Sequence, residues 1–365
     1  MALMNAHNAH NAHNAHNAHN AHSGGDASFA AESLSLALII AREGIGLAEP
    51  PAPAVPQPEP LAPIRRLRRI EEEFAHAILM FEMLETLTVT PPPADMAEAK
   101  IKLVGRGASG DKTLLTLGLP TAANFETEVA LVLGYADLRS ERLPEITVQT
   151  ADLVSFFLSI LPLRGARAPM TQRLLALVMD VATSAVQRIK LGFAAPRAEM
   201  FSDQVQPMIA TPLHGSFPSG HATQAFALAT LLSILTRQDS AKAAPIHSDS
   251  QLFRMAARIA TNRTVAGVHF PSDSAAGAIL GITLARWLAG RAGITSEPCP
   301  SMNFKGKRWG QTAPNHSRDF YIARLCEVLQ GDPCLVIGSP VVAPVSDLIA
   351  ALWAEAEAEW GLRWS

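Results

Sequence analysis

Apolar residues recur at helical spacing along most of this chain. Their period of about 3.6 residues predicts helices over residues 26–42, 70–87, 94–104, 122–136, 147–162, 168–190, 222–236, 250–266, 272–289, 317–329 and 343–358. In the second of these segments, Phe74, Ile78, Phe81 and Leu84 fall on one face. The alternation that is typical of strands is missing, apart from a short run at 334–337. The pattern therefore predicts an all-α helical bundle.

Two stretches interrupt this pattern without adding a sheet. Residues 105–110 read Gly-Arg-Gly-Ala-Ser-Gly, but they lack the Gly-Lys-Ser/Thr ending of a phosphate-binding loop and follow no buried strand. We interpret them as a plain loop. Residues 293–315 carry no clear period and indicate irregular structure.

The N-terminal part of the chain differs in composition from the rest. Residues 5–22 are tandem Asn-Ala-His triplets, which are typical of a purification tag, so we exclude residues 1–25 from the fold. Residues 26–64 combine one short helix with a proline-rich arm that is compatible with a homodimer. Residues 65–365 form the predicted single all-α domain.

Composition excludes some classes of function. A net charge of −3 provides no basic surface for nucleic acid. No stretch reaches the roughly 18 to 20 apolar residues that span a bilayer, so we expect a soluble chain with no transmembrane segment, of undefined compartment. The cysteines Cys299, Cys326 and Cys334 are odd in number and lack metal-site spacing. They give no disulfide framework, although one pair that includes Cys299 stays open.

The first candidate for chemistry is a short turn that leads into an apolar helix. Pro218 resists helix, and the helical period begins directly after Ser219, Gly220 and His221. The first N–H groups of a helix have no internal partner, so this position suits a tetrahedral oxyanion. Ser219 adds a hydroxyl, and His221 can move a proton beside the anion. The alternative is an ordinary capped helix with a surface histidine.

Two further stretches favour the anion site. Lys190 and Arg197 lie seven residues apart, so both can approach one anion. Downstream, Arg263 and His269 precede Asp273, and Pro271 between the last two indicates a new helix start. Asp273 could then hold the His269 ring by its second nitrogen. Three cations, a helix N-terminus and two histidines describe a phosphate-sized pocket.

These stretches together resemble the signature of one superfamily. It joins the type 2 phosphatidic acid phosphatases, the bacterial class A acid phosphatases and the vanadium-dependent haloperoxidases. The resemblance is carried by Lys190-x6-Arg197, by Pro218-Ser219-Gly220-His221 and by Arg263-x5-His269-x3-Asp273. The chain departs from the family pattern at Ala198, where the family usually has proline, and at Asn262, where it often has serine.

The resemblance implies a fold and a set of roles. It implies an all-α protein with a four-helix catalytic core, here at about residues 168–290. It also implies vanadate or phosphate as the bound anion, with its oxygens held by Lys190, Arg197, Ser219, Gly220 and Arg263. His269 would bond to the central atom and is the expected metal ligand, while His221 would act as acid and base. Asp273 is our candidate to orient His269.

Two enzymes fit these roles, and a third option is an anion-binding scaffold without turnover. The favoured one is a vanadium-dependent haloperoxidase using hydrogen peroxide and a halide, with Lys190 assisting. It is favoured by the long region before Lys190 and by the continuation His-Ala-Thr-Gln at 221–224. The alternative is a soluble acid phosphatase that hydrolyses a phosphate ester through a phosphohistidine at His269. Gly215-Ser216-Phe217 resembles the phosphatase pattern.

His214 bears on the choice of halide. It precedes His221 by seven residues, the offset at which the vanadium bromoperoxidases carry a histidine and the fungal chloroperoxidases a phenylalanine. The alternative is a loop histidine exposed to water. If the ring faces the site, it could contact the reacting oxygens or bromide, and its protonation near neutral pH would tune both. We therefore expect bromide and iodide as substrates.

Overall fold

The computed structural model describes residues 27–45, 60–90, 100–107, 109–161, 167–237 and 246–361. The chain divides into two compact units, Met1–Ala62 and Pro63–Ser365. In the first unit, the described helix α2 (Ala27–Ile45) confirms the helix predicted at 26–42. The predicted tag at 1–25 and residues 46–59 of the proline-rich arm lie outside the described residues.

The second unit is mostly helical, as predicted. Its α-helices are α3 (Pro63–Leu67), α4 (Glu72–Leu84), α5 (Ala122–Tyr135), α6 (Arg139–Gln149), α7 (Val154–Leu158), α8 (Pro169–Phe193), α9 (Gly220–Leu235), α10 (Gln251–Val265), α11 (Pro271–Arg291), α12 (Ile322–Gly331) and α13 (Asp347–Gly361). Most coincide with a predicted segment. The helix predicted at 147–162 is wrong as one element, because α6 ends at Gln149 and the short α7 begins at Val154. Among the described residues, no helix combines the length and the apolar character that a membrane span requires.

Helices α8 to α11 form the core of this unit, with α9 packed against the other three. Helix α9 is buried along nearly its whole length. Two glycines of α11 allow its close approach: a Cβ atom on Gly277 would lie 2.5 Å from Ser219 O, and one on Gly281 would overlap Thr223 O. The approach brings the N-termini of α9 and α11 together, where Ser219 N donates to Asp273 O at 2.9 Å.

Gly281→Ala should therefore destabilise the protein. The added methyl group would meet main-chain atoms of α9, which cannot rotate away, so we expect a loss of about 1–3 kcal/mol or more in the free energy of unfolding. Gly134→Ala on α5 is the matched control, because a Cβ atom there meets nothing within 4 Å. Chemical denaturation checks both variants. If the two variants have the same unfolding midpoint, the packing of α11 on α9 does not depend on this contact.

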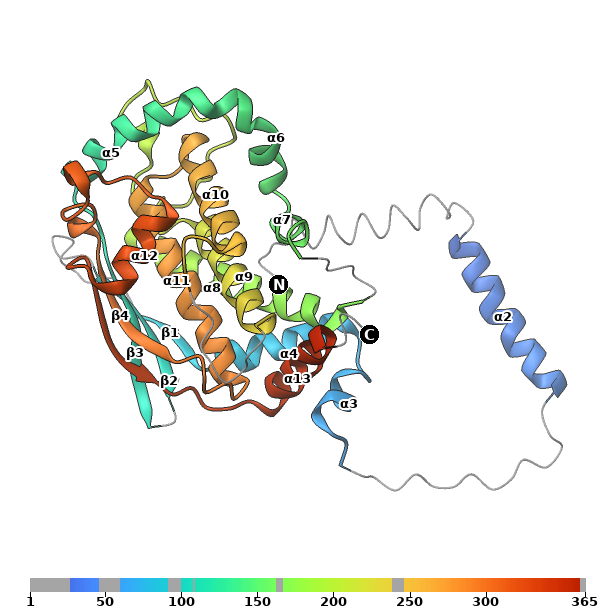
Figure 1. The fold of residues 1–365 in the computed structure, drawn as a ribbon. Helices are drawn as coiled ribbons and strands as arrows, with labels where there is room; N and C mark the ends of the chain where they lie inside the picture. Colours follow the sequence, from blue (N-terminus) through green and yellow to red (C-terminus); the bar gives the residue numbers. More distant parts are fainter. Residues whose placement is uncertain are drawn as a thin grey trace. The chain divides into compact units, whose positions relative to one another are not determined.

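The strict all-α prediction is wrong, because the unit also contains a five-stranded sheet. Its strands are β1 (Leu87–Val89), β2 (Lys100–Gly107), β3 (Gly110–Gly118), β4 (Cys299–Lys305) and β5 (Leu335–Val341). They lie in the order β1-β2-β3-β4-β5, and all neighbours are antiparallel except β3 and β4, which are parallel. The sheet lies along one side of the helical core, beside α11 and α12 (Figure 1).

The sheet corrects three sequence predictions. The helix predicted at 94–104 is wrong over its described part, where Ile101 and Leu103 of β2 point into the core and Lys100 and Lys102 are exposed. The plain loop predicted at 105–110 is the end of a hairpin in which Gly107 pairs with Gly110. The irregular segment at 293–315 contains β4. By contrast, β5 confirms the strand run predicted at 334–337.

Helix α4 buries a different face from the one its period suggested. The stripe of Phe74, Ile78, Phe81 and Leu84 is exposed, whereas Ala75, Leu79 and Met83 are buried. Helix α8 is the main neighbour of α4 in the core. At this contact His76 Nε2 lies 2.7 Å from Asp180 Oδ2, in a half-buried pair. The cysteines form no disulfide: Cys299, Cys326 and Cys334 are buried free thiols.

Candidate active site

The last turn of α8 carries Lys190 into the interior. Helix α8 ends at Ala194 in the left-handed conformation (φ 45°), and Lys190 is buried just before that end. Its ammonium donates to Gly215 O at 2.7 Å and to Ser216 O at 2.8 Å. An ammonium has three donors, so one remains beyond these two bonds. Lys190 therefore fixes the loop before α9 and keeps a donor for a ligand.

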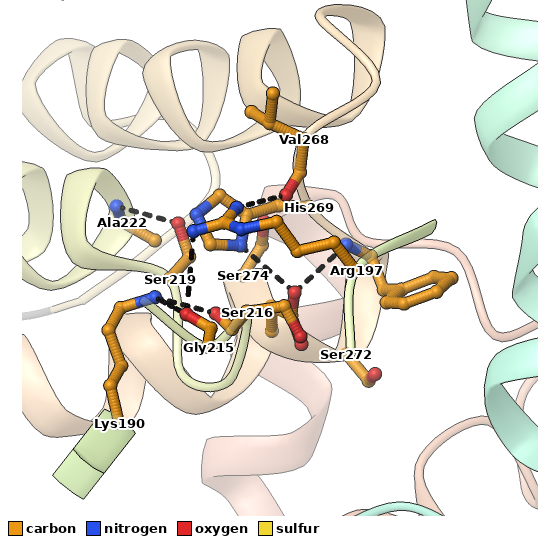
Figure 2. Close-up of polar contacts among 12 residues, drawn as sticks. Lys190, Arg197, Gly215, Ser216, Ser219, Ala222, Val268, His269, Ser272 and Ser274 are labelled. Carbon is orange, nitrogen blue, oxygen red and sulfur yellow. Dashed lines mark hydrogen bonds and ion pairs between the residues drawn. The ribbon is translucent and has the colours of Figure 1, made fainter. Parts of the chain in front are cut away.

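Arg197 connects the loops that lead into α9 and α11. Its Nη1 donates to Val268 O at 2.6 Å, and its Nη2 donates to His214 O at 3.0 Å. Figure 2 shows Lys190, Arg197, Ser219 and His269 approaching one another from different segments. The first and last of these residues, Lys190 and His269, are more than 70 residues apart in the sequence, and the fold brings their polar groups together.

Ser219 and Gly220 form the N-terminus of α9, as predicted. Ser219 is the N-cap, and its hydroxyl accepts from Ala222 N at 3.4 Å. Gly220 is the first helical residue, and a Cβ atom there would meet only the end of Val186 at 3.9 Å. The backbone at this helix start is therefore open on the side of the site, where the helix dipole favours an anion.

His269 and Asp273 form a buried pair at the start of α11. His269 Nδ1 lies 2.9 Å from Asp273 Oδ2, which also accepts from Phe270 N at 3.0 Å. Burial, and then the charges of Lys190 and Arg197, lower the pKa of His269 well below its ordinary value. The neutral ring therefore donates through Nδ1 to the carboxylate and keeps its lone pair on Nε2.

Arg263 reaches the site from α10 and is completely buried. Its Nη2 donates to Gln149 Oε1 at 2.8 Å and to Ile146 O at 3.3 Å. Its Nε and Nη1 have no hydrogen-bond partner among the described residues. A buried guanidinium with two unused donors is unusual, because leaving such a donor unpaired costs about 1–3 kcal/mol.

His221 is half-buried at the first turn of α9, with Nε2 3.0 Å from Gln149 O. A carbonyl oxygen can only accept, so Nε2 carries the proton and Nδ1 of the neutral ring is unprotonated. Burial, and then the charge of Arg263, lower the pKa of His221 to about 3. The ring is therefore neutral near pH 7 when no anion is bound.

His214 lies in the loop before α9 beside Arg197, with Nδ1 3.1 Å from Nη2. The residue is exposed, although the contact with Arg197 covers one side of its ring. Partial burial, and then Lys190, lower the pKa of His214. His214 therefore takes up a proton less readily than an ordinary histidine.

The site is an electropositive cage. Burial lowers the pKa of Lys190, and Arg197 lowers it further. Burial also lowers the pKa of Arg197, and lowers that of Arg263 to about 10. Asp273 acts on both Lys190 and Arg197, Glu199 acts on Arg197 as well, and burial raises the pKa of Asp273. A bound oxyanion would offset the excess positive charge and complete the donor set.

Two buried residues that support the site were missed in the sequence. Gln149 contacts both His221 and Arg263. Glu128 of α5 accepts from Ser272 N at 3.0 Å, at the start of α11, and pairs with Arg318 Nε at 2.7 Å. The only signal for Glu128 is an acid within an apolar helix, and its partner Arg318 lies 190 residues away.

The part of the chain that carries these site residues also matches a known protein family. Residues 171–291 match the PAP2 superfamily. The PAP2 segment runs from α8 to α11 and contains every site residue that the sequence predicted. It supports an enzyme of the phosphatase and haloperoxidase superfamily in general terms. None of the curated proteins compared with the chain matches it.

Proposed function

We propose that this chain is a vanadate-dependent haloperoxidase that oxidises bromide or iodide with hydrogen peroxide. One observation carries the proposal: the unpaired buried donors of Arg263, Nε and Nη1, belong to a cage of three cations. Phosphate and vanadate share charge and tetrahedral shape, so one cage suits both. The residues that would hold the anion are Lys190, Arg197, Ser219, Gly220, Arg263 and His269.

The arrangement at His269 is compatible with vanadate. The Nε2 lone pair is the nitrogen donor that the bond to vanadium needs, because Asp273 accepts the Nδ1 proton. When bound, vanadate supplies the activation of hydrogen peroxide toward a halide. His221 would take a proton from the peroxide through Nδ1 and return it to a leaving oxygen. Lys190, which keeps one donor, would stabilise negative charge on the reacting oxygens.

The second candidate is an acid phosphatase. It is favoured by Gly215-Ser216-Phe217, which resembles the acid phosphatase pattern and is packed tightly: a Cβ atom on Gly215 would lie 2.9 Å from Ala195 N. His269 Nε2 would attack phosphorus, forming a P–N bond as the P–O ester bond breaks. The negative charge of the bound ester would favour protonation of His221, which would give the Nδ1 proton to the leaving alkoxide. Water would then attack phosphorus as the P–N bond breaks, releasing phosphate and the neutral His269 ring.

One pair of assays separates the two enzymes. Protein loaded with orthovanadate is tested for bromide-dependent halogenation of a dye with hydrogen peroxide, and vanadate-free protein is tested for hydrolysis of a phosphate ester. Halogenation that requires vanadate and bromide supports the haloperoxidase. Ester hydrolysis with no halogenation for any halide would assign the chain to the phosphatases. Anion binding with neither reaction would leave only a binding scaffold.

His214→Ala should lower the rate of bromide oxidation and remove an inflection from its pH profile. The pKa of His214 is lowered by partial burial and then by Lys190, so protonation adds a positive charge beside Arg197 only as the pH falls below the ordinary histidine range, and the alanine variant cannot respond. Vanadate affinity should change little. His316→Ala, in an exposed 3₁₀ turn, is the matched control. Efficient chloride oxidation by the parent, or an unchanged pH profile in the variant, would contradict this role.

A further inference from the structure

Gln149 is buried at the end of α6, outside the PAP2 segment, and it contacts two site residues at once. Its side-chain Oε1 accepts from Arg263 Nη2 at 2.8 Å. Its main-chain oxygen accepts from His221 Nε2 at 3.0 Å. Arg263 and His221 belong to different helices, so this one residue sets the position of one relative to the other.

The contacts also define the orientation of the Gln149 amide. Asn262 Nδ2 donates to the same Oε1 at 3.1 Å. Both neighbours are donors, so Oε1 must face them and Nε2 must point away. That nitrogen has no hydrogen-bond partner among the described residues, although the side chain is buried. Gln149 and Arg263 thus each carry unused donors at the same buried contact.

Helix α6 is held on α10 by polar contacts along its length. Arg139 Nε donates to Val265 O at 3.0 Å, and Arg142 Nη1 donates to Asn262 Oδ1 at 3.2 Å. Glu145 accepts from Arg258 Nε at 2.8 Å. Gln149 is therefore the last residue of a fixed helix, and its side chain is placed with little freedom. Asn262 of α10 contacts Arg142, Glu145 and Gln149 of α6.

The charge of the side chain that contacts Arg263 matters as much as its position. Arg263 forms no ion pair within the part of the chain that the structure describes, and burial is the cause of its lowered pKa. A carboxylate at position 149 would neutralise Arg263 and compete with a bound anion. A neutral amide instead orients the guanidinium and leaves its charge available. This explains why glutamine suits the position.

We propose that Gln149 is a positioning residue that aligns Arg263 with His221 for one bound oxyanion while leaving the charge of Arg263 uncompensated. The proposal rests on the anion site described under the proposed function. It does not depend on which reaction follows. Its direct consequence is that the affinity for inorganic phosphate depends on Gln149 through Arg263.

The test measures phosphate binding by calorimetry at fixed pH. Gln149→Met retains the length of the side chain but cannot accept a hydrogen bond, and should weaken phosphate binding about tenfold, since bonds to charged groups are among the stronger ones. Gln149→Glu should weaken it further, because the new carboxylate would pair with Arg263. Thr147→Ala, two residues earlier on α6, is the control: it removes an exposed hydroxyl that donates to Leu143 O and should leave phosphate affinity unchanged.

A double-mutant cycle decides whether Gln149 acts through Arg263. If it does, the double variant Gln149→Met/Arg263→Gln should bind phosphate less than twofold more weakly than Arg263→Gln alone. Full additivity, or parent-like affinity in Gln149→Glu, would overturn the proposal. Halide oxidation and ester hydrolysis are measured separately. If phosphate binding depends on Gln149 but neither reaction occurs, the proposed function is refuted and this inference stands. If the protein is active and Gln149→Glu turns over at the parent rate, this inference is refuted and the proposed function stands.

Discussion

His269→Ala should abolish halide oxidation and ester hydrolysis together, the largest effect expected of any single substitution in this chain. In both reactions His269 would provide the bond to the central atom, through the Nε2 lone pair that its contact with Asp273 leaves free. Lys190 and Arg197 act as hydrogen-bond donors in this site, so neither replaces that bond. Their charges remain, so weak binding of phosphate should survive. Steady-state assays and calorimetry measure the two effects.

The matched control is His76→Ala. His76 also pairs with an aspartate, with Nε2 2.7 Å from Asp180 Oδ2, but it joins α4 to α8 away from the anion cage. Its loss should cost stability and leave turnover intact. Activity near the parent rate in His269→Ala would refute the assignment of the central bond. Complete loss of phosphate binding in that variant would show that His269 holds the anion rather than reacting with it.

His221→Ala should slow turnover by about 10²–10⁴-fold, the range typical of a lost general acid or base. The ring is neutral at neutral pH because burial, and then Arg263, lower its pKa to about 3, so Nδ1 is ready to accept a proton. The bond from Nε2 to Gln149 O keeps that nitrogen away from the ligand. Since His221 contributes no positive charge, phosphate affinity should change much less than the rate.

The comparison of rate with affinity separates two roles for His221. Calorimetry with phosphate and steady-state kinetics are run on the same preparation, with His316→Ala carried through as a control for loss of a histidine. A collapse of affinity with a high residual rate would make His221 an anion ligand, and its role would be exchanged with that of His269. Equal losses in rate and affinity would indicate a structural role in the first turn of α9.

Much of the fold was predictable where structure depends on neighbours in the chain. The helical periods correspond to α5, α8 and α10, because an amphipathic helix places its buried residues at fixed spacing, whereas α11 is buried along nearly its whole length. The segments that approach the anion cage were predictable for a related reason. Lys190 ends a helix, and Ser219 and Pro271 begin others, so each lies where a helix terminus exposes unpaired backbone groups.

The sheet was not predictable in the same way. The alternation in β2 covers only a few residues, and one of the two partners of β4, strand β3, lies almost 200 residues earlier in the chain. Strand propensity depends on those partners more than on the strand itself. The exposed stripe of α4 shows the same limit, since which face of a helix is buried depends on the neighbour that packs against it.

Local sequence determined the residue types of the site, their order and the helix ends that carry them. The tertiary structure decided which atoms of those residues remain available. Gln149, 72 residues before His221, selects the tautomer of that ring and occupies one nitrogen of Arg263. Glu128 and Arg318, 190 residues apart, pair beneath the start of α11. Hydrogen bonds between buried groups require contact in space, and spacing along the chain does not encode which distant groups will meet.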